Sequence, residues 1–373
     1  MKRFLSAVFI ITVSFVVGCK SSTGPVINNG FSNHYTDADG NVQMDPPPIG
    51  EGIQMVIEPF DVPRDSDLQG DFYFHLPSDV DFNVGRIEIA MNQGSHHMNL
   101  FRSPVAWPPD SGMPRTMVFT RDNGKKDTVS VRYQPQFNSS IIWNEADLML
   151  ESQLPYLNWA LPKLPDGTQA AIKLGANDTL IAEAHYNNIA VLDGGGSQTA
   201  PNGKGKVIIN LWKAPAGTTT SASMMFARKS NLSLPPMQET TVYKDCFFSP
   251  TDLPRPIYIL GMTGHFHSRG KTFVVDKMTY LKDSTGAFTN VVDPTPVETI
   301  YRSAAWNEPP FTVYDTPIKL EQNQFIRYTV TYFNNTENTI VFGPHTKINE
   351  HCNLFLWFTP NWEGGRTLYD NQN

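Results

Sequence analysis

The sequence predicts an all-β chain that folds as two tandem antiparallel β-sandwich domains. Its 29 prolines and 26 glycines, together with 12% aromatic residues, favour many short strands joined by turns over long helices. Strand-like runs recur roughly every 10–15 residues with Gly, Pro, Asn or Asp between them, which is the spacing of a β-sandwich. With 373 residues the chain is too long for one such domain, so two are expected.

Composition narrows the class of function. Hydrophobic residues make up 40% of the chain and charged residues 17%, which is enough apolar surface for real cores and argues against a disordered chain. The net charge is −7 and no basic patch is visible, so nucleic acid is not an expected partner. No nucleophile elbow, phosphate loop or His-Glu-x-x-His motif occurs, which leaves the nine histidines as the main functional signal.

The N-terminus has the pattern of an export signal. Lys2 and Arg3 precede the apolar run Phe4–Gly18, which is too short to span a bilayer comfortably and suits a signal-peptide core, residues 1–18. Cys19 directly after Gly18 resembles a bacterial lipobox, so we expect a lipoprotein that Cys19 anchors to an extracytoplasmic membrane face. The alternatives are an ordinary secretion signal with an incidental cysteine, or an uncleaved anchor.

Three segments follow the signal. Residues 19–50 are rich in Ser, Asn, Asp and Pro and predict a flexible tether. Residues 51–213 and 214–373 are the two expected sandwiches, with the boundary near Ala214. The Gly-rich stretch 193–205 is a second possible linker, although it can equally be a hairpin loop because the strong strand Val207–Trp212 follows it.

The expected strands are short, and two cysteines lie among them. The clearest strands are Gly70–Leu76, Val84–Met91, Asp127–Tyr133, Thr179–Tyr186, Val207–Trp212, Ile257–Met262, Thr272–Leu281 and Phe325–Phe333.

After Cys19 only Cys246 and Cys352 remain. They can form one disulfide in an oxidising compartment or stay as two thiols.

The first histidine pair lies at the end of a predicted strand. His265 and His267 are two residues apart, so both imidazoles point to the same face of a sheet, as two ligands of one metal ion would. A single His-x-His is weak on its own, because two partly exposed polar residues at a strand end give the same pattern.

Two further histidine segments precede that pair in the chain. His96 and His97 are adjacent, so both can face one site only at a strand end or a β-bulge, which Gly94 just before them permits. His185 closes a strand and shares a face with Glu183, a candidate hydrogen-bond partner for a ligand. A lone histidine at a strand end is more often a core residue than a ligand.

A fourth segment, Glu350-His351-Cys352-Asn353, follows near the end of the chain and completes a family resemblance. In order, the four segments resemble the copper type II, ascorbate-dependent monooxygenases, which include peptidylglycine α-hydroxylating monooxygenase and dopamine β-monooxygenase. The similarity covers roughly residues 52–362. The matching residues are His96-His97-Met98, His185-Tyr186-Asn187-Asn188, His265-Phe266-His267-Ser268-Arg269-Gly270 and Glu350-His351-Cys352-Asn353.

The resemblance implies two jelly-roll sandwiches that each hold one copper ion and face each other across an open cleft. An electron-transfer copper is expected on His96, His97 and His185, and the catalytic, O2-activating copper on His265, His267 and His351. A reductant such as ascorbate would supply two electrons, and a small organic substrate would be hydroxylated. Imidazole suits copper as a ligand.

The chain departs from the family pattern in its ligands and its substrate anchors. His351 stands where the family has a methionine, which predicts an all-nitrogen site that accepts Cu(II) well. His345 is an alternative third ligand. The peptide-hydroxylating branch holds a carboxylate with an Arg and a Tyr, and here Thr263 and Phe355 replace them while Asn353 is kept. Peptidylglycine is therefore not the expected substrate, although Asn353 and Phe355 remain candidate substrate contacts.

Three functions are compatible with this pattern. The first is a copper-dependent monooxygenase acting on a small molecule outside the cytoplasm. The second is a lipid-anchored copper-binding protein for delivery, storage or sensing, which the exchange of methionine for His351 motivates. The third is an exported adhesion or polysaccharide-binding module in which the histidines are incidental.

Overall fold

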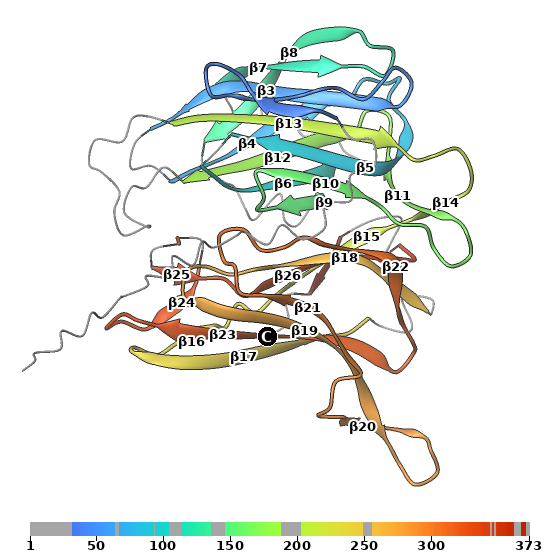
Figure 1. Ribbon diagram of the computed structural model, residues 1–373, viewed down its shortest axis with the longest axis vertical. Helices are drawn as coiled ribbons and strands as arrows, with labels where there is room; N and C mark the ends of the chain where they lie inside the picture. Colours follow the sequence, from blue (N-terminus) through green and yellow to red (C-terminus); the bar gives the residue numbers. More distant parts are fainter. Residues whose placement is uncertain are drawn as a thin grey trace, which may run out of the picture. The chain divides into compact units, whose positions relative to one another are not determined.

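The computed structural model describes residues 32–63, 67–92, 94–103, 113–135, 146–187, 203–248, 256–343, 345–346, 348–361 and 367–370. The predicted signal peptide and Cys19 lie outside these residues. Every regular element within them is a strand, so the all-β prediction is confirmed (Figure 1). The same part of the chain contains no helix long and apolar enough to cross a membrane.

The first half of the chain forms one strongly curled sheet. Its strand order is β14-β11-β5-β13-β3-β7-β8-β4-β12-β6-β9, with β10 paired to β5. The strands are β3 Gly52–Val62, β4 Asp67–His75, β5 Phe82–Met91, β6 Ser95–Ser103, β7 Met113–Thr120, β8 Lys126–Pro135, β9 Asp147–Ser152, β10 Tyr156–Ala160, β11 Gln169–Leu174, β12 Thr179–Asn187, β13 Gly203–Lys213 and β14 Thr219–Ser221. Alternating apolar residues of these strands fill one core.

The second half packs two five-stranded sheets against each other. One has the order β22-β18-β26-β15-β27, the other β17-β23-β19-β20 with β21 beside β19, and β16-β24-β25 form a small third sheet. Residues of both large sheets, such as Met262 and Phe273, share one core. The strands are β15 Ser223–Arg228, β16 Ser233–Leu234, β17 Gln238–Cys246, β18 Ile257–His265, β19 Gly270–Lys282, β20 Phe288–Val292, β21 Glu298–Ser303, β22 Thr312–Leu320, β23 Gln324–Asn334, β24 Ile340–Phe342, β25 Asn349–Glu350, β26 Asn353–Thr359 and β27 Leu368–Asp370.

Part of the predicted tether is ordered. The strands β1 (His34–Thr36) and β2 (Val42–Met44) pair with each other, and the buried side chains of Val42 and Met44 pack on the first sheet. The Ser32 hydroxyl donates a hydrogen bond of 2.9 Å to the buried Glu88. The compact unit therefore begins at Ser32 rather than at residue 51, because two apolar side chains at period two find a partner surface.

The chain passes from the first half to the second later than the predicted boundary at residue 214. Strand β14 still pairs with β11 of the first sheet, where Gln169 lies opposite Thr219. Strand β15 pairs with β26 and β27 of the second half. The crossing therefore falls at the buried Ala222 between these two strands.

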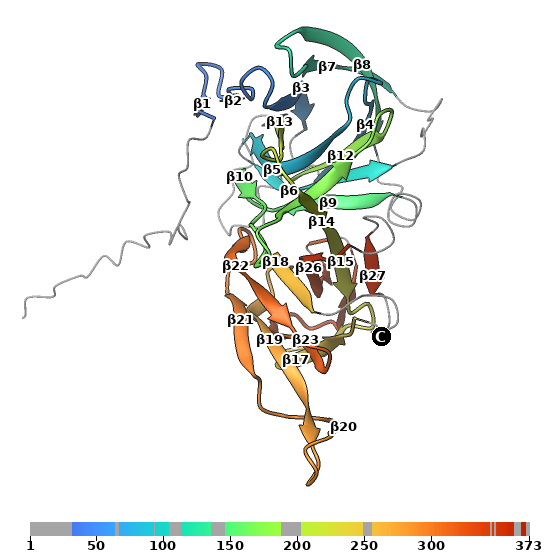
Figure 2. The ribbon, with the colours of Figure 1, turned by 90° about the vertical axis from the view of Figure 1, so that its right-hand side faces the viewer.

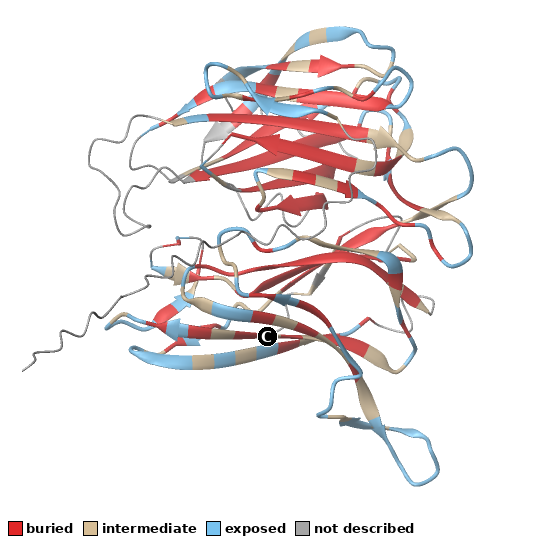
Figure 3. Cartoon of the chain, in the orientation of Figure 1, coloured by how far each residue is buried: buried red, intermediate tan, exposed pale blue. Residues whose placement is uncertain are grey.

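The two sandwiches share an apolar interface. Phe355 and Trp357 of β26 belong to the core of the first half rather than to that of their own half. The Trp357 Nε1–H donates a hydrogen bond of 2.7 Å to the carbonyl of Met149, and its ring lies 5.0 Å from that of Trp159. Strands β18 and β26 lie in the part of the second half that faces the first half (Figure 2). They are buried along almost their whole length, whereas β20 is partly or fully exposed throughout and β17 is exposed over most of its first six residues (Figure 3).

This interface predicts that the two sandwiches unfold together. Replacing Trp357 with Ala removes a large buried side chain and is expected to cost about 3–5 kcal/mol. Differential scanning calorimetry should show one transition for the wild type and one shifted transition for the variant. The matched control is Tyr243→Ala, at a site where the ring is 55% exposed, and it should barely move the transition. Two separate transitions, of which only one shifts, would contradict the shared core.

Candidate metal centre

The His-x-His motif sits where strand β18 ends and turns. His265 is the last residue of β18, and the Gly270 amide closes the following turn by donating to the His267 carbonyl at 3.0 Å. A Cβ on Gly270 would overlap the Phe266 ring, which explains why this position is glycine. The rings of His265 and His267 lie 5.5 Å apart, so the two imidazoles share one side as the sequence predicts.

A buried carboxylate fixes the loop that carries His267. Glu350 accepts hydrogen bonds from the backbone N–H groups of His267, at 2.7 Å, and Arg269, at 2.9 Å. Burial raises the pKa of Glu350 to about 7, although these donors oppose the shift. Because Glu350 directly precedes His351, one short segment both supports His267 and delivers a third imidazole.

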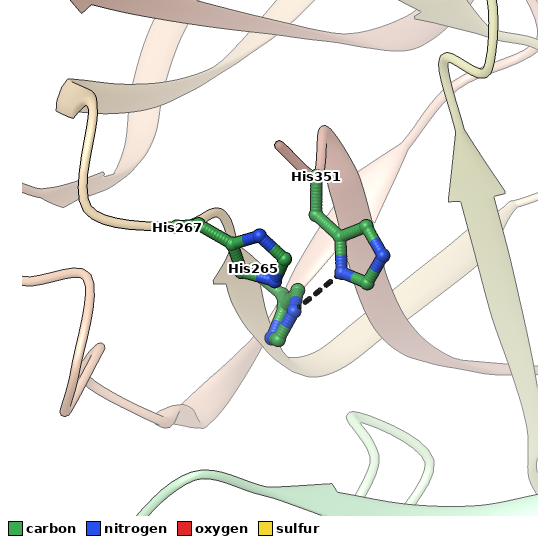
Figure 4. Close-up of side chains that lie close together, drawn as sticks. All are labelled: His265, His267 and His351. Atoms are coloured by element: carbon green, nitrogen blue, oxygen red, sulfur yellow. Dashed lines mark hydrogen bonds between the residues drawn. The ribbon is translucent and has the colours of Figure 1, made fainter. Parts of the chain in front are cut away.

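His351 joins the pair to complete a cluster of three imidazoles (Figure 4). The His265 Nε2 and His351 Nδ1 atoms lie 2.7 Å apart, and one nitrogen from each of the three rings lies within 4.8 Å of the others. His345, the alternative ligand, is exposed and is not part of the cluster. The structure therefore brings together His265, His267 and His351.

Burial favours the neutral form of two imidazoles of the cluster, those of His267 and His351. The His267 Nδ1 lies 3.1 Å from the Asn349 carbonyl, so this nitrogen donates and Nε2 is left as an acceptor. Burial, opposed by this hydrogen bond, lowers the pKa of His267 to about 4. Burial also lowers the pKa of His351, and the positive charges of His267 and its neighbours add to the shift. Neutral imidazole is the form that binds a metal ion.

The other predicted ligands lie on β6 and β12. His97 pairs with His185, and Ser95 pairs with Tyr186, so β6 carries one extra residue at His96. Of the two arrangements that the sequence left open, a strand end or a bulge, β6 has the bulge, and Gly94 before it has φ +93°. The rings of His97 and His185 meet edge to face at 4.7 Å. The side chain of His96 lies outside the described part of the chain.

The two histidine sets contact each other. The ring centroids of His97 and His265 are 5.7 Å apart and their planes are nearly perpendicular. The open cleft that the family resemblance implied is therefore not the arrangement here. The apolar interface around Trp357 packs the two sandwiches directly together, and His97 of β6 meets His265 of β18 in the same interface.

A buried row of polar residues, of which the sequence analysis named only Glu183, lies beside the histidines. Asp71, Glu183, Asn99 and Glu151 are cross-strand neighbours on β4, β12, β6 and β9. Glu183 Oε1 accepts from Asn99 Nδ2 at 2.8 Å and lies 3.3 Å from His97 Nε2, so its predicted supporting role agrees with the geometry.

Two carboxyl groups of this row, those of Asp71 and Glu151, have strongly raised pKa values. Burial, then the charge of Glu183, raises the pKa of Asp71 to about 9. Burial raises the pKa of Glu151 to about 8, and its Oε1 lies 3.8 Å from His265 Nδ1. Neutral carboxyl groups at these positions avoid placing several negative charges in one dry interface. An acid that directly adjoins a run of aromatic residues, as Asp71 does before Phe72-Tyr73-Phe74, is a sequence signal that would have pointed to the row.

The candidate substrate residues lie next to the cluster on β26. Phe355 stacks on Phe226 at 4.9 Å and presents its edge to His265 at 6.4 Å. Asn353 is the cross-strand neighbour of His265 on one side and of Arg228 on the other. Arg228 was not predicted.

The two cysteines are buried free thiols. Burial raises the pKa of Cys352 to about 12 and that of Cys246 well above its ordinary value. Of the two alternatives that the sequence left open, the structure has the thiols. Protonated thiols at these sites are poor metal ligands.

Comparisons with known proteins do not identify a family. No family model matches the chain, and no curated protein matches it. A candidate secreted protein from Parabacteroides distasonis is 10% identical over 89% of this chain and 98% of its own, with a TM-score of 0.17. The structure of infectious bursal disease virus, Gx strain, is 8% identical over 93% of this chain and 78% of its own, with a TM-score of 0.16. Similarities this weak support no statement on fold or function.

The raised pKa of Asp71 predicts a pH-dependent stability. Between its unfolded value near 3.8 and its folded value of about 9, only the folded state keeps the proton. Stability from this group is therefore present at low pH and falls as the pH rises, by up to about 1.4 kcal/mol per pH unit. Asp71→Asn cannot ionise, so its advantage over the wild type in urea denaturation should grow from pH 5 to pH 8. The exposed control Asp39→Asn should show no such trend, and a pH-independent difference for Asp71→Asn would contradict the assignment.

The Glu350 contacts predict an effect on metal affinity. Glu350→Ala leaves the amides of His267 and Arg269 without their acceptor and frees the loop, which should weaken metal binding about 10–100-fold. Titration of Cu(I) in competition with a chelator measures the change. Glu298→Ala removes an exposed carboxylate on β21 and serves as the control. Equal affinities in both variants would show that Glu350 does not position the ligands.

Proposed function

We propose that the protein is a copper-dependent monooxygenase that hydroxylates a C–H bond of a small organic molecule. In the overall reaction the substrate C–H, O2, two electrons and two protons give C–OH and water. A reductant such as ascorbate supplies the electrons. The observation that carries the proposal is the convergence of His265, His267 and His351 on one point of a buried interface.

The donor set fits copper. Three neutral imidazoles are a common copper environment, and no carboxylate or thiolate joins this trio among the described residues. A bound copper ion would supply the one-electron chemistry that O2 needs before it can attack a C–H bond. The support from Glu350 would hold the trio in place without rearrangement, and the surrounding apolar side chains would exclude water from it.

His96, His97 and His185 are proposed to hold a second copper ion that receives electrons. Glu183, which lies 3.3 Å from His97 Nε2, would orient that ring. The contact between His97 and His265, with centroids 5.7 Å apart, makes the path between the two ligand sets short. Asn353 and Phe355 would contact the substrate beside the trio.

The location proposed for this activity is the extracytoplasmic face of a bacterial membrane. The lipobox-like sequence ending at Cys19 supports a lipid anchor, and residues 20–31 would connect it to the compact unit that begins at Ser32. Small-molecule substrate and O2 are the expected partners.

One observation favours a second function, copper binding without turnover. The third imidazole, His351, replaces the softer thioether of the family, and an all-nitrogen site stabilises Cu(II) more than methionine does. A protein that holds copper firmly in this form would serve storage or delivery. Oxygen consumption separates the two functions.

Copper titration of the full-length chain in detergent tests the proposal. We expect about two equivalents of firmly held copper for the wild type and about one for His351→Ala, because that variant loses one of three ligands of one site. His345→Ala, an exposed histidine six residues upstream, is the matched control and should keep both equivalents. Wild-type stoichiometry in His351→Ala would remove this residue from the ligand set.

Oxygen uptake with ascorbate is measured on the same samples with a panel of small organic substrates. A monooxygenase consumes O2 in step with product, whereas copper binding alone gives no uptake above that of free copper. Firm binding of copper without substrate-dependent uptake would favour the storage function.

A further inference from the structure

A carboxyl group of the first sandwich faces the metal cluster of the second. Glu151 lies on β9 and His265 ends β18, and the Glu151 Oε1 atom is 3.8 Å from His265 Nδ1. The two side chains are 2% and 4% exposed, so both groups are buried in the interface between the halves. This contact therefore joins a carboxyl group of one half to a predicted metal ligand of the other.

The packing of its own strand does not explain why Glu151 is a carboxylic acid. Every residue of β9 is buried, and the three residues before Glu151 are Leu148, Met149 and Leu150. The Gln153 amide lies near enough to oppose the rise in the pKa of Glu151, yet neither Glu151 oxygen completes a hydrogen bond of normal geometry within the described part of the chain. Burial of a carboxyl group is unfavourable without a hydrogen-bond partner, and the His265 imidazole is placed to be that partner.

The two ring nitrogens of His265 have different surroundings. Nε2 lies 2.7 Å from His351 Nδ1, so it is the nitrogen on the side of the cluster (Figure 4). Nδ1 faces Glu151 instead. An imidazole that binds a metal ion through Nε2 carries its proton on Nδ1, and an acceptor for this N–H fixes the orientation of the ring. The Asn349 carbonyl, 3.1 Å from His267 Nδ1, already has this place for the second ligand.

We propose that Glu151 positions His265 from across the interface, by accepting a hydrogen bond from its Nδ1–H when a metal ion occupies the cluster. The two atoms must approach by roughly 1 Å to reach the ~2.8 Å of a charge-assisted hydrogen bond. Contacts of this kind are often long before the ligand binds and shorten in the complex. The inference rests on the proposed function only in requiring a metal ion on the three imidazoles.

The contact makes metal binding and the packing of the two sandwiches interdependent. Glu151 belongs to the first half and the three imidazoles to the second, so a bond that forms only with the metal in place also draws the halves together. By linkage, whatever strengthens one of these equilibria strengthens the other by the same factor. A ligand shell confined to the second half would not have this property.

Copper titration of the full-length chain in a His185→Ala background tests the contact, because the three-imidazole cluster is then the site expected to hold copper firmly. Glu151→Leu should weaken Cu(II) binding about 10–100-fold, since the His265 N–H loses its acceptor. Glu151→Gln keeps an oxygen that accepts, so it should lose less. Asp71→Asn is the matched control, because it changes a buried carboxyl group of the same row that lies three strands away from β9.

Two further measurements separate positioning from a structural role. Pulsed electron paramagnetic resonance of the Cu(II) form detects the remote nitrogen of a bound imidazole, whose quadrupole coupling changes with its hydrogen bond. Glu151→Leu should change this signal, and Asp71→Asn should leave it as it is. The melting temperature of the metal-free chain should not fall in Glu151→Leu, because an apolar side chain of similar size suits a buried site.

Wild-type copper affinity and an unchanged remote-nitrogen signal in folded Glu151→Leu would overturn the proposal. Equal losses of affinity in Glu151→Gln and Glu151→Leu would also overturn it, because only one of these variants lacks an acceptor. Failure of the cluster to bind copper at all would refute both this inference and the proposed function. Firm copper binding without oxygen uptake would refute only the proposed monooxygenase.

Discussion

This structure depends on the packing of the first-half sheet against the sheet that contains β18 and β26. Their interface has an apolar area and, beside it, a polar area. Trp357 and its aromatic neighbours exclude water from one area. In the adjoining area, imidazoles and carboxyl groups meet in the same dry environment. Burial lowers the pKa of His267 and raises that of Glu151, so both groups become neutral at moderate pH. A buried set of neutral imidazoles is well suited to receive a cation.

The polar area also explains why the supporting residues are carboxyl and amide groups. An imidazole needs a partner for its second nitrogen if its ring is to keep one orientation. Asn349 supplies a carbonyl to His267, and Glu183 lies beside His97. Glu183 lies on β12, which pairs with β6 of His97. Asn349 lies on β25, just before β26, and β26 pairs with β18 of His265, so strand pairing sets much of the geometry of the site.

Much of this arrangement could be predicted from sequence, because it follows from local periodicity. Alternation placed His265 and His267 on one side. Two adjacent histidines could face one site only at a strand end or a bulge, and β6 has a bulge at His96. What could not be predicted depends on long-range pairing. Asp71 and Glu151 reach the site only through the strand order β4-β12-β6-β9, and Arg228 only through the pairing of β15 with β26. The ordered segment from Ser32 was missed because Val42 and Met44 give too short an apolar signal among turn residues.

Diffraction from crystals of the copper-loaded protein, recorded on both sides of the copper absorption edge, tests the central claim most directly. The account predicts a strong anomalous peak bounded by the ring nitrogens of His265, His267 and His351. Copper found only elsewhere on the chain, or these three rings turned away from a bound ion, would contradict it.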